Sequence, residues 1–281
     1  MLRFAVGRKL TLGALATALA ATAATAVVAS SNRDVDESFP SVALAGKAHA
    51  LVVLPPDYAT SGLRYPVVYF LHGLPAPPTA YRSNGWVERA LEAAGPAILV
   101  EPQGARAGDS DSEYLDRGAG RNWETFLTGE LPRYIDAHFR TIRDRRARAL
   151  VGLSAGGYGA AVLGLRHLGT FSVIESWSVY FHPTDPTGTK ALDLGPSTSA
   201  HNLIEALRAD ERQRPTFFAF YVGRGDAHFR AENVLFDREL TRAAVPHVFE
   251  LYRGGHDTAV WEAHASGWLG MALGRLDRPE R

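Results

Sequence analysis

The feature that most constrains the fold is the sequence Gly-Leu-Ser-Ala-Gly at residues 152–156, which joins two segments of different periodicity. The apolar run at residues 149–152 is typical of a buried strand, and the apolar residues after Ser154 repeat with helical spacing. A serine between small residues at a strand-to-helix junction is the pattern of a nucleophile elbow, a sharp turn that exposes the serine hydroxyl. We therefore expect Ser154 at the carboxyl end of a strand in a layered α/β domain.

Short apolar runs typical of buried strands recur along the chain, at residues 48–54, 66–71, 97–100, 149–152, 173–181, 217–222 and 248–252. Helical patterns lie between them, at residues 86–94, 122–138, 155–165 and 227–244. Pro132 is expected to kink or interrupt the second of these helices. Strands that alternate with helices predict an α/β fold with a mainly parallel central sheet and helices on both faces.

The chain of 281 residues divides into three predicted parts. Three basic residues precede an uncharged stretch that ends at residue 29, which is the layout of a secretory signal peptide over residues 1–29 and predicts a secreted or cell-envelope location. An uncleaved membrane anchor is the alternative, since about 20 uncharged residues can span a bilayer. Residues 30–40 are polar and predict a linker, and residues 41–281 are long enough for one large domain.

Composition excludes several classes of site. The chain has no cysteine, so disulfides, thiolate metal sites and cysteine nucleophiles are absent. It carries 30 basic and 30 acidic residues, a balance that does not favour a nucleic-acid partner. Acidic residues at 109, 111, 113 and 116 do not fit a calcium-binding loop, because Tyr114 and Gly120 stand at its glycine and glutamate positions. They are interpreted as a solvated acidic loop, and no metal or cofactor is predicted.

A serine nucleophile needs a base, and ten histidines compete for that role. His256 follows the last predicted strand in the sequence Gly-Gly-His-Asp, where the chain order serine, acid, histidine requires the base. The other candidates are interpreted as structural (His138 and His167), as a substrate contact (His228) and as part of the closing helix (His264).

The acid is expected after a strand that lies between the serine and the histidine in the chain. Asp226 is the first carboxylate after the run at residues 217–222. Four alternatives remain, three of them further along the next helix and one in the histidine loop: Glu232, Asp237, Glu239 and Asp257.

The backbone N–H groups of Ala155 and Leu74 are the candidates for an oxyanion hole. Ala155 follows the nucleophile, and Leu74 lies in the loop after an earlier strand, as this kind of site requires. His72 in that loop is interpreted as shaping it. The stretches at residues 104–121 and 182–199 have no predicted structure and are expected to determine specificity. Trp261 and Trp268 are interpreted as packing residues of the closing helix.

The chain resembles the esterase branch of the α/β-hydrolase fold, which includes feruloyl and acetylxylan esterases, S-formylglutathione hydrolases and bacterial mycolyltransferases. The resemblance covers nearly all of residues 41–273. Its markers are LPPDY at 54–58, YPVV at 65–68, LHG at 71–73, WETFL at 123–127, ELP at 130–132, the elbow followed by GYG at 157–159, and GGHD at 254–257.

The resemblance implies a serine esterase with Ser154 as nucleophile, His256 as base and Asp226 as acid, and the predicted signal peptide implies that it is exported. It implies a substrate that is a small-molecule ester or an ester on a polysaccharide or lipid. The chain departs from many relatives at Ala155, in the proline-rich loop after Leu74, and at Thr258. An acyltransferase that moves an acyl group to a sugar hydroxyl is one alternative, and a non-catalytic exported binding protein is another. A membrane tether is expected only if residues 1–29 are retained.

Overall fold

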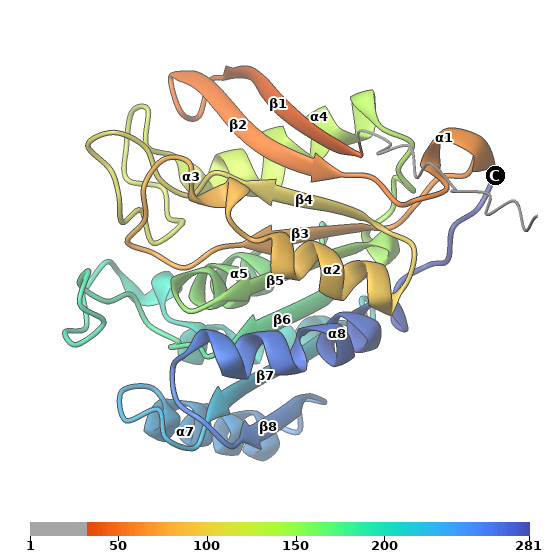
Figure 1. Ribbon diagram of the computed structural model, residues 1–281. Helices are drawn as coiled ribbons and strands as arrows, with labels where there is room; N and C mark the ends of the chain where they lie inside the picture. The colour runs from red at the N-terminus through yellow and green to blue at the C-terminus, as the bar shows by residue number, and fades with distance from the viewer. Residues whose placement is uncertain (1–32) are drawn as a thin grey trace, which may run out of the picture. The chain divides into compact units, whose positions relative to one another are not determined.

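The computed structural model describes residues 33–281. In this part of the chain eight strands form one sheet in the order β1-β2-β4-β3-β5-β6-β7-β8 (Figure 1). The strands at one edge, β1, β2 and β4, pair antiparallel, whereas the pairs from β4 through β3 to β8 are parallel, so the predicted mainly parallel sheet is confirmed. The strands are β1 (Asp34–Ser41), β2 (Gly46–Val53), β3 (Val67–Leu71), β4 (Ile98–Pro102), β5 (Arg148–Leu153), β6 (Val173–Trp177), β7 (Phe217–Gly223) and β8 (Val248–Tyr252).

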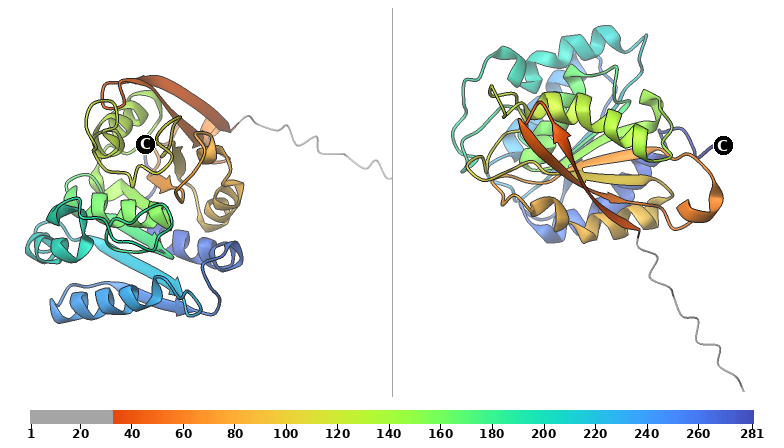
Figure 2. Two further views of the ribbon diagram at one scale, coloured as in Figure 1. Left: turned by 90° about the vertical axis from the view of Figure 1, so that its left-hand side faces the viewer. Right: turned by 90° about the horizontal axis from the view of Figure 1, so that it is seen from above.

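Helices cover both faces of the sheet, as predicted (Figure 2). Helices α2 and α8 share one apolar cluster with the sheet, and α4, α5, α6 and α7 contribute to the clusters on the other face. Short 3-10 turns connect some elements, at residues 80–82, 145–147, 196–198 and 200–203. The helices are α1 (Tyr58–Ser61), α2 (Gly85–Ala94), α3 (Trp123–Thr125), α4 (Leu131–His138), α5 (Ala155–Arg166), α6 (Ile204–Asp210), α7 (Arg230–Arg242) and α8 (Thr258–Leu273).

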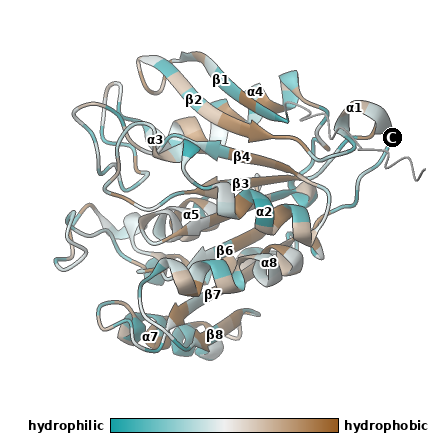
Figure 3. Cartoon of the chain, in the orientation of Figure 1, coloured by the Kyte–Doolittle hydropathy of each residue, from teal (hydrophilic) through white to brown (hydrophobic). Residues whose placement is uncertain are grey.

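The central strands are mostly apolar because both faces of the sheet are covered (Figure 3). Every residue of β3, β4 and β6 is buried. Fully burying a valine, leucine or phenylalanine side chain contributes roughly 1.5–3 kcal/mol, so these strands are a main source of the fold's stability. They also fix the positions of the loops that follow their carboxyl ends.

The predicted linker at residues 30–40 is wrong for most of its length, because residues 34–41 form the edge strand β1. This strand pairs antiparallel with β2 over eight residue pairs. Its outward side chains are exposed, and Phe39 and Ser41 turn inward. A polar sequence suits an edge strand with one solvated face, which is why its composition resembled that of a linker.

Two other predicted elements differ from the structure. The helical segment at residues 122–138 is interrupted by a π-helical turn at Phe126–Glu130, and Pro132 lies in the first turn of α4, where helices tolerate proline. The strand predicted at residues 173–181 ends at Trp177. Ser178 has a φ of 47°, a left-handed conformation that cannot continue a strand.

Candidate active site

Ser154 stands on a strained turn between β5 and α5. Its φ of 56° is unusual for a residue other than glycine, and the turn lifts the side chain out of the sheet. The flanking glycines are required by close packing. A Cβ at Gly152 would lie 2.0 Å from the carbonyl oxygen of Gly156, and one at Gly156 would lie 2.0 Å from that of Leu71. The elbow that the sequence predicted therefore has a steric basis.

The structure brings the three predicted side chains together. The Nε2 atom of His256 lies 3.0 Å from the hydroxyl oxygen of Ser154, and its Nδ1 atom lies 3.0 Å from the carboxylate oxygen Oδ2 of Asp226. Ser154 follows β5, Asp226 follows β7 and His256 follows β8. All three strands are parallel, so their carboxyl ends meet at one edge of the sheet.

Asp226 is held as a carboxylate by its hydrogen bonds. Its side chain is fully buried, and burial alone would raise its pKa. The bond to His256 and the backbone N–H groups of Phe229 and His228, at 3.0 and 3.1 Å, outweigh burial and lower the pKa below its usual value. The negative form is thus favoured, and it can orient the imidazole and stabilise its protonated state.

Four glycines let the loops that carry the acid and the histidine approach each other. The N–H of Gly225 donates to the carbonyl oxygen of Gly254 over 2.7 Å. A Cβ at Gly223 would lie 2.5 Å from the carbonyl oxygen of Gly255, so no side chain fits there. Gly254 itself has a φ of 125°. The glycine-rich character of both loops is explained by this contact.

Two aromatic rings contact the imidazole of His256. Phe229 and Trp261 meet it edge-on, with ring centroids 5.2 and 5.3 Å away. The indole N–H of Trp261 donates to the Ser178 hydroxyl over 2.9 Å. Both tryptophans pack as predicted, Trp268 within the core and Trp261 against it, but the prediction missed the contact of Trp261 with the candidate base.

The two candidate oxyanion donors belong to residues close to Ser154. Ala155 is the first residue of α5, and Leu74 lines the same cavity as the serine. Within residues 33–281 neither N–H donates to a protein acceptor, so both are free to bind an oxygen atom from a substrate. His72 is buried and bonds the N–H of Gly104 and the carbonyl oxygen of Gly73, which agrees with a loop-shaping role.

All but one of the other candidate histidines and carboxylates from the sequence analysis lie in separate networks, and the exception is His228. Asp257 caps helix α8 through the N–H of Val260. Glu232 and Glu239 bond His201, and Asp237 bonds His247. His167 bonds Glu124, His138 stacks on Tyr134, His264 stacks on Tyr252, and His228 lines the cavity beside Ser154.

A comparison with family models assigns the chain to a family. The family model described as "Putative esterase" matches residues 41–267. The chain belongs to the Esterase family. The fold is the α/β-hydrolase fold: the solved structure of a ferulic acid esterase superimposes with a TM-score of 0.75 at 25% identity, covering 87% of this chain and 98% of that one.

Two curated relatives have similar sequences. An esterase of Mycobacterium tuberculosis is 30% identical over 236 residues, which cover 73% of this chain and 51% of that protein. An S-formylglutathione hydrolase of Rattus norvegicus is 26% identical over 239 residues, which cover 76% of this chain and 83% of that protein. This member of the Esterase family thus spans about half the length of the mycobacterial relative.

A cavity of about 220 Å³ opens beside the candidate triad of this Esterase-family domain. The loop after β4 contributes Asp111 and Glu113 to it, and the segment after β6 contributes residues 184–188. The two stretches without predicted structure therefore supply much of the lining. The prediction that the acidic residues at 109–116 form a solvated loop is wrong in part. Glu113 is 1% exposed, and Asp109 accepts a buried hydrogen bond from Trp123. Contacts with residues that are distant in the sequence bury these two side chains.

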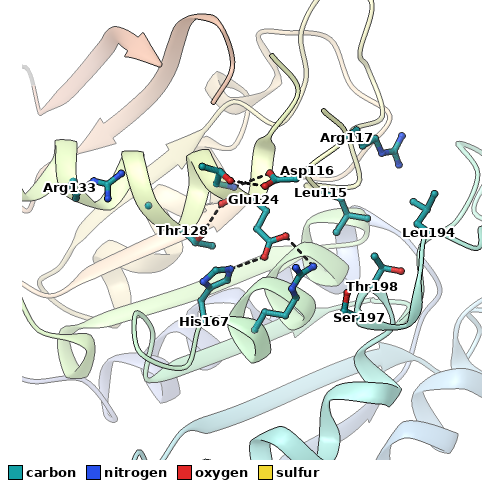
Figure 4. Close-up of a pocket in the computed structure, with 13 residues that line it drawn as sticks. Leu115, Asp116, Arg117, Glu124, Thr128, Arg133, His167, Leu194, Ser197 and Thr198 are labelled. Carbon is teal, nitrogen blue, oxygen red and sulfur yellow. Dashed lines mark hydrogen bonds and ion pairs between the residues drawn. The ribbon is translucent and has the colours of Figure 1, made fainter. Parts of the chain in front are cut away.

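A second hollow, of about 740 Å³, lies between α3 and the end of α5 (Figure 4). Its acidic groups are already paired: Glu124 bonds Arg166 and His167, and Asp116 bonds Thr125. None of the three triad residues lines it. In residues 33–281 no cluster of three or more histidines and carboxylates has the arrangement of a metal site.

Proposed function

We propose that the chain is a serine esterase that hydrolyses carboxylic esters through Ser154, His256 and Asp226. The observation that carries the proposal is the imidazole of His256, which bridges the serine hydroxyl and the buried carboxylate at 3.0 Å on each side. This is the arrangement that turns a weak hydroxyl into a nucleophile. Membership of the Esterase family and the esterase names of its relatives support the same reaction.

The reaction proceeds in two steps of acyl transfer. His256 takes the hydroxyl proton of Ser154 as the oxygen bonds to the ester carbonyl carbon, and the carbonyl oxygen becomes an oxyanion. The N–H groups of Leu74 and Ala155 bind that oxyanion. The alcohol then leaves with the proton from His256. Water repeats the sequence on the acyl-enzyme and releases the acid, which restores the serine.

Covalent labelling tests the proposed nucleophile. A fluorophosphonate probe should label the wild-type protein and should not label Ser154→Ala, which should also lose hydrolysis of 4-nitrophenyl acetate. Ser83→Ala, at an exposed serine, is the matched control and should keep both properties. Labelling that persists in Ser154→Ala would show that another residue reacts. A wild-type protein that is neither labelled nor active would favour the non-catalytic binding protein.

Hydrolysis is preferred over acyl transfer to a sugar because Asp226 directly follows Gly225, as in the hydrolytic members of the branch. Product analysis of an ester reaction with and without trehalose separates the two reactions. Free acid as the main product in both samples supports the esterase. An acylated sugar as the main product in the trehalose sample would instead identify an acyltransferase.

Export is a further part of the proposal, and it rests on residues 1–29, which lie outside the described residues. The described helices include none that is long and apolar enough to cross a bilayer. N-terminal sequencing of the protein recovered from the culture medium and from the cell envelope tests the prediction. A first residue near 30 supports a cleaved signal peptide, and an intact first residue in the membrane fraction supports an anchor.

A further inference from the structure

The cavity beside Ser154 contains a buried carboxyl group that no step of the proposed reaction uses. Glu113 lines this cavity and is 1% exposed. Its Oε1 atom accepts a hydrogen bond of 2.8 Å from the hydroxyl of Tyr180, whereas its Oε2 atom has no partner within residues 33–281. Leaving a buried polar atom unpaired costs about 1–3 kcal/mol. A ligand group that bonds Oε2 from the cavity would remove this cost.

The backbone around Glu113 is strained and firmly held. Glu113 and Tyr114 have φ values of 50° and 57°, a left-handed conformation that is uncommon for residues with side chains. The buried ring of Tyr114 fixes them. It fills the space over Gly104 and Gly159, where an added Cβ would lie 2.5 and 2.7 Å from the ring, and its hydroxyl bonds the carbonyl oxygen of His72. Strain of this kind concentrates at ligand-binding sites.

The chemistry of the carboxyl group favours an uncharged polar ligand group. Burial raises the pKa of Glu113 to about 8, so the group is mostly neutral at pH 7. A neutral carboxyl group both donates and accepts hydrogen bonds, which a hydroxyl group can match. The cavity of about 220 Å³ is smaller than the roughly 300–1,000 Å³ of typical ligand pockets, so the part of the substrate that fills it is short.

Tyr180, which donates a hydrogen bond to Glu113, is itself held by neighbouring rings. Its ring stacks on Tyr158 with centroids 5.3 Å apart and packs against Phe229 at 5.1 Å. The same Phe229 contacts the imidazole of His256. Glu113 and the candidate catalytic groups are therefore connected by one set of packed rings, which keeps the distance between them constant.

We propose that Glu113, positioned by Tyr180, is a specificity-determining residue that binds a hydroxyl group on the short part of the ester that fills this cavity. The inference rests on the proposed function, because the ester carbonyl must lie at Ser154. The hydroxyl group can belong to the acyl part or to the alcohol part of the substrate. The chemistry is the same in both cases, and the experiment tests the two parts separately.

The experiment compares kcat/KM at pH 7 for two ester pairs in which a hydroxyl replaces a methyl group. The acyl pair is the 4-nitrophenyl esters of 3-hydroxybutanoic and 3-methylbutanoic acid, and the alcohol pair is 2-hydroxyethyl and propyl acetate. The wild-type protein should prefer the hydroxylated member of one pair by about tenfold. Glu113→Leu should abolish the preference, and Glu113→Gln, which keeps a donor and an acceptor, should retain most of it.

A matched control is available at Glu101, a second buried carboxyl group whose pKa burial raises to about 8. It lies in β4 and does not line the cavity, so Glu101→Leu should leave the preference unchanged. If Glu113→Leu does not fold, as judged by circular dichroism, the preference is measured in Tyr180→Phe instead. A preference reduced several-fold in that variant supports the inference, and an unchanged preference contradicts it.

Three other results would overturn the inference. They are equal kcat/KM values within both pairs, an undiminished preference in folded Glu113→Leu, and faster hydrolysis of an ammonium-bearing ester than of the hydroxylated one. In each case fluorophosphonate labelling of Ser154 would show that the esterase proposal itself still holds. A wild-type protein that is not labelled and hydrolyses none of the esters would overturn both proposals.

Discussion

The hydroxyl of Tyr114 donates a hydrogen bond of 2.6 Å to the backbone carbonyl oxygen of His72. The bond joins the loop after β4, which lines the cavity, to the loop after β3, which carries Leu74. Burial lowers the pKa of His72, so its ring stays neutral and Nε2 can accept the N–H of Gly104. The cavity wall and the candidate oxyanion donor are therefore held as one unit.

Removing the hydroxyl of Tyr114 should affect both stability and activity. Tyr114→Phe leaves a buried carbonyl oxygen without its donor, so we expect the free energy of unfolding to fall by about 1–3 kcal/mol. We also expect kcat to fall several-fold, because the loop that carries Leu74 loses a support. Urea unfolding and ester kinetics measure the two effects. Tyr65→Phe removes a hydroxyl that bonds Ser61, and it should leave kcat unchanged.

The elbow glycines should tolerate no side chain. Gly156→Ala places a Cβ 2.0 Å from a backbone oxygen, so we expect a loss of 1–3 kcal/mol or more in the free energy of unfolding, with loss of activity. The matched control is Gly267→Ala in α8, where an added Cβ meets nothing within 4 Å. Because alanine favours a helix over glycine, that variant should gain about 0.5–1 kcal/mol. Equal unfolding midpoints for the two variants would contradict the steric explanation.

Asp226 should contribute a stability that depends on pH. Its hydrogen bonds lower its pKa in the folded state, so the ionised form stabilises the fold above its ordinary pKa of about 4. This contribution is lost as the pH falls through the lowered folded value. The difference in the free energy of unfolding between wild type and Asp226→Asn should be constant near neutral pH and shrink below about pH 4.

Activity gives a second measurement on the same variant. Asp226→Asn removes the negative charge that orients and stabilises the imidazolium, so kcat should fall by about 10⁴ at neutral pH. A variant that keeps most of the wild-type kcat would show that another carboxylate fills this role. A stability difference that grows as the pH falls would contradict the assigned direction of the pKa shift.

Trp261 should position the candidate base. Trp261→Leu removes the ring against His256 and the bond to Ser178, so we expect kcat to fall by about tenfold with little change in KM. Trp268→Leu is the contrasting variant, since that side chain is 3% exposed in the core. It should lower the unfolding midpoint more than Trp261→Leu and lower the kcat of the folded protein less. The reverse pattern would argue against the positioning role.

The positions of the three candidate catalytic residues were predictable from sequence because the ends of parallel strands converge. Ser154, Asp226 and His256 each follow an apolar run, and parallel strands bring such positions to one edge of the sheet. The residue types at these strand ends then identified the roles, since few other side chains there could serve as nucleophile, acid and base. Local pattern and chain order sufficed here, without knowledge of any contact between distant segments.

The predictions that were wrong share a different cause. Strand β1 has a polar sequence because one side of it faces solvent, so hydrophobicity did not reveal it. The burial of Asp109 depends on the indole of Trp123, and that of Glu113 depends on Tyr180 and the fold of its loop. Such contacts join residues far apart in the chain. The two consecutive left-handed residues at 113 and 114 also have no sequence signature, since neither is glycine.

Most of the lining of the 220 Å³ cavity and the three candidate catalytic residues follow different strands of the sheet. The walls come largely from the segments after β4 and β6, whereas the proposed nucleophile, acid and base follow β5, β7 and β8. Most of the cavity lining can therefore vary while Ser154, Asp226 and His256 keep their places at the strand ends. Grafting either segment from another member of the family should change selectivity, provided that the graft keeps Tyr114, which supports the loop of Leu74, and Ser178, which bonds Trp261.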